Sequence, residues 1–189
     1  MHRFVDTIKN AASGRNVLLF LIPSLAVYLV MLVHTIPGVQ SYAPGMKIFD
    51  LSPGGYLYEY AIELFSALGD EGRKKYLNTQ LPLDFIYPAL FAISSALLLT
   101  WLFLKRYDKH SKVFYFCFVP IFAGLFDYLE NIQIVIMILN FPDISNAQVF
   151  LSSICTMAKS GLTTIFFLLL LFATIRVWIG SKSKNQSST

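Results

Sequence analysis

Charged residues, histidines and cysteines are all scarce in this chain. Of its 189 residues only 14% are charged, whereas 56% are hydrophobic. The mean hydropathy is +0.59. A soluble domain usually contains about 25% charged residues. The composition therefore argues against an ordinary soluble domain and indicates an integral membrane protein.

Several kinds of chemical site are also missing. The three histidines, His2, His34 and His110, lie in separate segments, so neither a metal-ligand spacing nor a Ser/His/Asp arrangement is present. Cys117 and Cys155 form no C-x-x-C motif and fall in different apolar segments, so we expect them to remain unpaired. No glycine-rich phosphate loop occurs. We therefore expect neither a metal nor a cofactor.

The sequence does, by contrast, contain four long apolar segments. Each is long enough to cross a bilayer as a helix, since about 20 apolar residues suffice. The fold class that they predict is all-α integral membrane, a four-transmembrane-helix bundle. It forms a single domain over residues 1–180, followed by a polar cytoplasmic tail at 181–189. The expected spans are residues 17–35, 84–105, 113–140 and 148–178.

Proline and capping residues refine these helix limits. We expect the Pro37-Gly38 turn to end the first helix and Pro120 to kink the third. Pro88 falls in the first turn of the second helix, where its missing N–H is harmless. Ser145 and Gln148 resemble a capping box before the fourth helix. Gly161 in that helix would allow close approach of a neighbour.

The connection between the first two helices is long and aromatic. From Tyr56 to Leu68 the apolar side chains form one stripe and the polar ones lie elsewhere, which predicts an amphipathic helix ended by Gly69. We expect residues 55–79 to lie on the membrane surface or to form a lid over the helix ends. The stripe consists of Leu57, Ala61, Leu64, Phe65 and Leu68.

The basic residues flank the apolar segments, so they are explained by topology and not by nucleic-acid binding. Lys and Arg are concentrated in residues 1–16, in the 105–112 loop and near the C-terminal end. The positive-inside rule places these three segments in the cytoplasm and residues 36–82 outside. We therefore expect a plasma-membrane or inner-membrane protein with both termini cytoplasmic.

The most unusual stretch lies near the middle of the third segment. Asp127, Glu130 and Asn131 are spaced so that they share one helix face. Charged groups at bilayer depth are costly and must face protein or water. Lys159 lies about 15 Å from the outer end of the fourth segment, and Glu130 lies at a similar depth in the third. Because helices joined by a short turn are usually antiparallel neighbours, we expect Lys159 to pair with Glu130 or Asp127.

Two further residues are candidates for the mouth of this site. Asp84 and Tyr87 fall at the outer end of the second segment. The predicted ligand-binding set is thus Asp127, Glu130, Asn131, Lys159, Asp84 and Tyr87. Structural roles compete with this interpretation: Asp84 as an N-cap, Tyr87 as an interface residue, and the central group as a salt bridge that fixes helix register.

Two functions fit these features. The first is binding of a small amphiphile or lipid-like ligand at a buried charged site in the outer half, with acid–base or proton-relay chemistry as its sharper form. Whether the protein is an enzyme stays open. The second function is that of a non-catalytic structural or assembly subunit, which would dock a membrane protein partner through residues 55–79.

Overall fold

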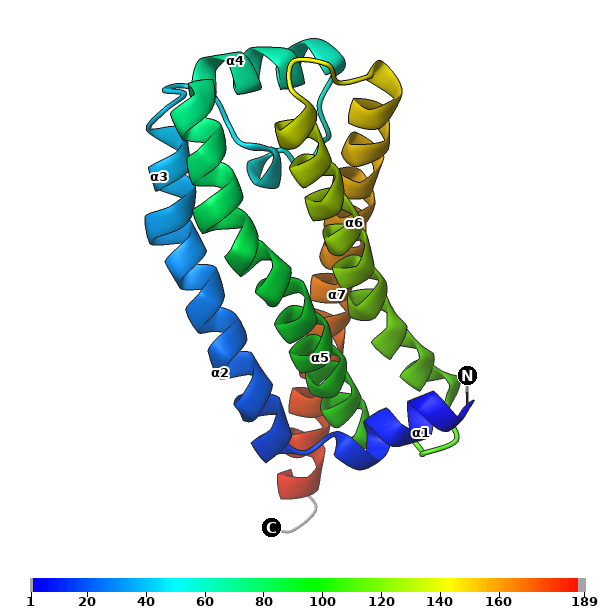
Figure 1. Ribbon diagram of the computed structural model, residues 1–189. Coiled ribbons are helices and arrows are strands. Elements are labelled where there is room, and N and C mark those ends of the chain that lie inside the picture. Colours follow the sequence, from blue (N-terminus) through cyan, green and yellow to red (C-terminus); the bar gives the residue numbers. More distant parts are fainter. Residues whose placement is uncertain (1, 187–189) are drawn as a thin grey trace.

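The computed structural model describes the backbone of residues 2–186 and the side chains of residues 3–179. Within this part of the chain the regular elements are all helical. Figure 1 shows the long helices α2, α5, α6 and α7 running between an end covered by α4 and an end crossed by α1. We call these the α4 end and the α1 end. The elements are α1 His2–Ala11, α2 Gly14–Val30, η1 Met31–Thr35, α3 Ile36–Gln40, η2 Phe49–Leu51, α4 Tyr58–Lys75, η3 Tyr76–Gln80, α5 Leu81–Leu104, η4 Lys112–Cys117, α6 Phe118–Asn140 and α7 Asn146–Gln186.

Four helical stretches are long and apolar enough to cross a membrane, as the sequence predicted. They cover Gly14–Gln40, Tyr58–Leu104, Lys112–Asn140 and Asn146–Ile179. Helix α5 packs against α2 and α6, and α6 packs against α7. An apolar core lies toward each end, and the buried polar residues of α5, α6 and α7 lie between the two cores.

The first long helix does not end at the Pro37-Gly38 pair. One turn of π-helix, Met31–Thr35, follows α2 and leads directly into α3, which ends at Gln40. Pro37 lies in the first turn of α3, where it removes a single hydrogen bond and does not break the helix. The predicted end near residue 35 is therefore wrong by about one turn.

The second long helix begins earlier than residue 84. Helix α4 changes direction at Gly69, whose φ of 61° and ψ of −175° are accessible mainly to glycine. From there the chain stays helical through η3 into α5. The amphipathic helix before Gly69 is confirmed, since Ala61, Leu64, Phe65 and Leu68 are buried. Leu57 of the predicted stripe lies just before the helix and is 74% exposed, so it does not pack with the other four residues.

Two predicted helix features of α6 and α7 also need correction. Pro120 lies in the first turn of α6, where its missing N–H is harmless, so it does not kink the helix. No atom lies within 4 Å of a Cβ built on Gly161, whereas one built on Gly124 would lie 2.9 Å from the Pro88 carbonyl oxygen. The close approach is therefore between α5 and α6. Ser145 does cap α7, accepting a hydrogen bond from Gln148 N at 3.2 Å.

The two ends of the chain contain more helix than the sequence indicated. Helix α7 continues to Gln186, so residues 181–186 of the expected tail are helical, while residues 187–189 lie outside the described part. The polar N-terminal segment forms α1, which lies across the α1 end (Figure 1). Val5 is 4% exposed and packs in the apolar core at that end.

The loop between α3 and α4 fills the α4 end of the molecule. After α3 the chain turns back beneath α4 and forms the short helix η2 between the long helices (Figure 1). Ile48 and Phe49 are fully buried there. The loop, residues 41–57, brings Asp50 into the interior beside helices that are distant in sequence.

Candidate functional site

An ion pair joins α6 and α7 inside the molecule. The Nζ atom of Lys159 lies 2.9 Å from Oδ1 of Asp127 and 2.5 Å from Oε2 of Glu130. Glu130 is fully buried and Asp127 is 8% exposed. Both acids predicted as partners of Lys159 therefore contact it at once, and the prediction of a buried pair is confirmed.

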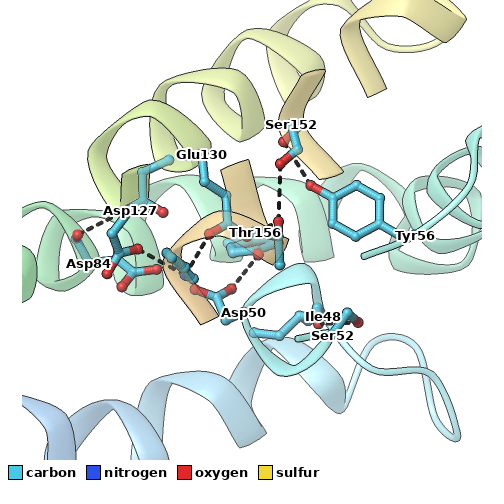
Figure 2. Close-up of polar contacts among 12 residues, drawn as sticks. Ile48, Asp50, Ser52, Tyr56, Asp84, Asp127, Glu130, Ser152 and Thr156 are labelled. Atoms are coloured by element: carbon cyan, nitrogen blue, oxygen red, sulfur yellow. Dashed lines mark hydrogen bonds and ion pairs between the residues drawn. The ribbon is translucent and has the colours of Figure 1, made fainter. Parts of the chain in front are cut away.

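Hydroxyl groups on α7 extend this network toward the α4 end. Thr156 Oγ1 donates a hydrogen bond of 2.6 Å to Glu130 Oε1. One turn further, the hydroxyls of Ser152 and Tyr56 lie 2.7 Å apart, and the backbone N–H of Tyr56 donates to Ser153 Oγ at 2.9 Å. Figure 2 shows the Tyr56 ring directed toward Ser152. The loop is thus fixed to α7 beside Glu130.

Asp84 and Asn131 connect α5 to α6 through a backbone contact. Pro88 has no N–H, so the carbonyl of Asp84, four residues earlier, lacks its helical donor. Asn131 Nδ2 donates to that carbonyl oxygen at 2.7 Å. Because the helix continues from η3 into α5 without a break, Asp84 is not an N-cap. Asp84 as a residue is 2% exposed, so its carboxyl group lies in the interior.

Asp50 joins the site from the loop, and the sequence analysis missed it. Tyr76 donates a hydrogen bond of 2.5 Å to Asp50 Oδ2, and the carboxyl group of Asp84 lies close to that of Asp50. Burial disfavours the charged form of Asp50, but the neighbouring Asp84 carboxyl group, the charge of Lys159 and the hydrogen bond from Tyr76 outweigh it. The pKa of Asp50 consequently lies below its ordinary value.

These residues form one group that we call the charged centre: Asp50, Asp84, Asp127, Glu130 and Lys159. Figure 2 shows Asp84, Asp127 and Glu130 directed toward the same interior region as Asp50. The charged centre thus contains four carboxyl groups and a single amine, that of Lys159, which contacts two of them. Such an excess favours the uptake of protons or of a cation.

Some polar atoms near the charged centre have no hydrogen-bond partner. Among the described residues these include Asp84 Oδ2, Asn131 Oδ1 and Gln80 Nε2, each of them buried. The side-chain oxygen of Gln80 accepts a hydrogen bond from the buried hydroxyl of Thr35. Buried polar atoms are normally satisfied, so free acceptors and a free donor here provide contacts for a polar ligand.

Tyr87 is the predicted site residue that makes no hydrogen bond to this network among the described residues. Its ring stacks on Tyr28 with centroids 5.5 Å apart and lies 5.8 Å from the ring of Phe91. Within the described residues no hydrogen bond joins its hydroxyl to the charged centre. His34 is exposed on the π turn after α2. The mouth predicted from Asp84, Tyr87 and His34 stays a prediction.

Asp84, Asp127 and Glu130 are buried, and an open pocket borders the loop. This pocket, of about 550 Å³, lies between the loop and α4 at the α4 end. Tyr56 lines the pocket and also contacts Ser152 within the network. Two carboxylates of α4, Glu59 and Glu63, lie at its wall and are exposed. Lys47 also lines the pocket, so two carboxylates and one amine lie at its wall, and the loop lies between this pocket and the charged centre.

No metal site or disulfide is formed in the part of the chain that the structure describes. No group of three or more His, Cys, Asp or Glu side chains has an arrangement that would hold a metal ion there. Cys117 and Cys155 are both free and buried, as the sequence predicted.

Asp50 could have been found from a local signal in the sequence. It is the one acidic residue between His34 and Glu59, and Ile48, Phe49 and Leu51 surround it. An acid within such an apolar segment indicates a buried partner.

Comparison with known proteins finds no matching family, no similar curated protein and no similar solved structure. The functional argument therefore rests on the geometry of the site.

Proposed function

We propose that the protein is a multi-pass membrane protein that binds the positively charged headgroup of a small amphiphile at the charged centre. The observation that carries this proposal is the excess of buried acid over Lys159. A buried charge is stable only when it is paired. An ammonium or similar headgroup would neutralise the excess and bond to the acceptors on Asp84 and Asn131.

The proposed entry route is the pocket at the α4 end. Exposed carboxylates on Glu59 and Glu63 would raise the local concentration of a cation there. Tyr56 separates this pocket from Glu130, so movement of the loop would open the route. With both termini in the cytoplasm of a plasma or inner membrane, the ligand would enter from outside.

The same groups support acid–base chemistry as the sharper form of the proposal. A general acid or base must lie within hydrogen-bond reach of the proton that it transfers. Asp127 and Glu130 both lie within 3 Å of the Lys159 amine, so a proton can pass among these groups without large movement. An amphiphile held against them would be in reach of either carboxyl group.

Binding of a single-chain alkyl primary amine tests the proposal. We expect the amine to raise the midpoint of thermal unfolding of the purified protein in maltoside detergent, with the alcohol of equal chain length giving no comparable rise. Asp50→Asn should weaken the response to the amine. The matched control is Asp143→Asn, which changes an exposed acid at the same end. Equal responses to amine and alcohol, or an unchanged response in Asp50→Asn, would contradict the proposal.

A structural or assembly role is the second candidate, and exposed apolar side chains at the α4 end favour it. Leu57 is 74% exposed and Tyr42 is 42% exposed. A membrane protein partner docked on residues 55–79 would cover them. Cross-linking from position 57 in cells tests this role, because a specific adduct that disappears in Leu57→Asp would support it.

A further inference from the structure

A second cavity lies at the α1 end, between α1, α2 and α5. Its volume is about 440 Å³, which falls in the range of about 300–1,000 Å³ typical of ligand pockets. Phe4 and Ile93 on its wall are 50% and 42% exposed, so the cavity opens to the surface. The lining is apolar except for Thr7 and Asn16.

Small side chains on α5 create this cavity. Ala89, Ala92 and Ala96 line it and recur at the spacing of one helix face. At about 100° per residue, Ala89 lies about 140° around α5 from Asp84. The cavity and the charged centre therefore occupy different faces of the same helix, and the cavity is a separate site.

Arginine side chains flank the cavity along the chain. Arg3 precedes Phe4 and lies one turn from Thr7 on α1, since the Thr7 hydroxyl donates to the Arg3 carbonyl at 3.0 Å. Arg15 precedes Asn16 at the start of α2. Both arginines are exposed, and no acidic side chain pairs with either among the described residues.

The acidic residue of α1 is already paired with a lysine. Asp6, the acidic residue of α1, forms an ion pair of 3.0 Å with Lys9. Lys9 also donates to the carbonyl of Lys109 at 2.8 Å and lies 4.9 Å from the centre of the Phe114 ring, so it anchors α1 to the molecule. The two arginines that adjoin cavity-lining residues in the chain thus have no acidic partner among the described residues.

We propose that this cavity binds an acyl chain of an anionic phospholipid, whose phosphate lies beside Arg3 and Arg15. An apolar cavity next to exposed arginines matches a lipid with an apolar chain and a negative headgroup. Helix α1 is amphipathic and lies across the ends of the long helices, where a headgroup layer would be (Figure 1). The inference rests on the proposed membrane location but not on the charged centre.

Native mass spectrometry of the full-length protein in detergent tests the site, with phosphatidylglycerol and phosphatidylcholine of identical chains as probes. We expect tighter binding of phosphatidylglycerol. Arg3→Gln and Arg15→Gln should each weaken phosphatidylglycerol binding by about five-fold and leave phosphatidylcholine binding unchanged. Lys112→Gln, which removes an exposed charge elsewhere at this end, is the control.

Two bulky substitutions on opposite walls test the cavity itself. Ala89→Phe on α5 and Thr7→Phe on α1 should each lower the binding of both lipids, whereas Ile86→Phe, on an exposed position of α5, should not. Thermal unfolding identifies a variant that fails to fold, and the other wall then supplies the test. Equal affinity for both lipids, or lipid binding unaffected by both bulky variants, would overturn the proposal. If a bulky variant changed the oligomeric state of the protein and left lipid binding unchanged, that result would overturn the proposal too. Alkyl-amine binding at the charged centre is measured separately, so either site can fail alone.

Discussion

At the scale of single residues, the charged centre depends on Lys159 more than on any one acid. Lys159 contacts Asp127 and Glu130 together, and Asp50 and Asp84 lie close behind them. Removing one acid leaves Lys159 another partner, but removing Lys159 leaves every acid without a cation. The consequences of substitution should therefore be asymmetric.

Lys159→Met should lower the free energy of unfolding more than Glu130→Leu does. Breaking a buried pair costs about 3–5 kcal/mol in soluble proteins, and we expect a smaller loss in detergent, where other partners compensate. Replacing both residues should recover much of the loss. Chemical unfolding in detergent measures these differences, with exposed Lys74→Met as the control. A larger loss for Glu130→Leu would show that the acids are not the residues in excess.

The contact between Asn131 and the Asp84 carbonyl gives a second prediction at this scale. Asn131→Ala should cost about 1–3 kcal/mol, because it leaves a buried carbonyl without a donor. In the Pro88→Ala background the helix supplies its own N–H, so the same substitution should cost less. A double-mutant cycle measures the difference. Equal costs in both backgrounds would show that the proline does not create the need for Asn131.

At the scale of elements, the loop is the part of the site that sequence patterns did not reveal. Glu130 and Lys159 were predictable as a pair because helix rise converts residue number directly into depth. The depth of Asp50 cannot be calculated from its residue number, since it depends on how residues 41–57 turn back between the helix ends. The end of the first helix was misjudged for a related reason. The helix continues through a π turn and then through Pro37, and no residue pattern marks that turn.

Gly55 lets the loop lie close against α7, so substitution of Gly55 should displace the loop. Its φ is +81°, and a Cβ there would lie 2.5 Å from Ser153 Oγ. Gly55→Val should therefore destabilise the protein by about 1–3 kcal/mol and expose the loop to protease. Gly54→Val is the matched control, because no atom lies within 4 Å of a Cβ at that position. Similar effects of both variants would show that the loop is not held by this contact.

At the scale of the whole molecule, the distribution of charge predicts its orientation. The α1 end carries Arg3, Lys9, Arg15 and the basic 105–112 loop. The α4 end carries Lys47 and residues 73–75, with acids nearby. Positive-inside orientation would place the α1 end in the cytoplasm, beside the anionic lipids that the second cavity is proposed to bind.

Cysteine labelling tests this orientation. In a variant without Cys117 and Cys155, a cysteine at position 74 should react with an impermeant reagent on intact cells. A cysteine at position 109 should react only after permeabilisation. Both native positions, Lys74 and Lys109, are exposed, so accessibility is limited by the membrane alone. The reverse pattern would place the pocket at the α4 end in the cytoplasm and reject the proposed entry route from outside.

The Asp84 carbonyl also has a consequence for biosynthesis. Its donor is a side chain on the following helix, so α5 emerging alone from the ribosome contains a carbonyl that nothing in its own segment can satisfy. Hydrocarbon offers no substitute donor. If the long helices span a membrane as proposed, α5 and α6 should therefore enter the bilayer together as a hairpin, after Asn131 has been synthesised.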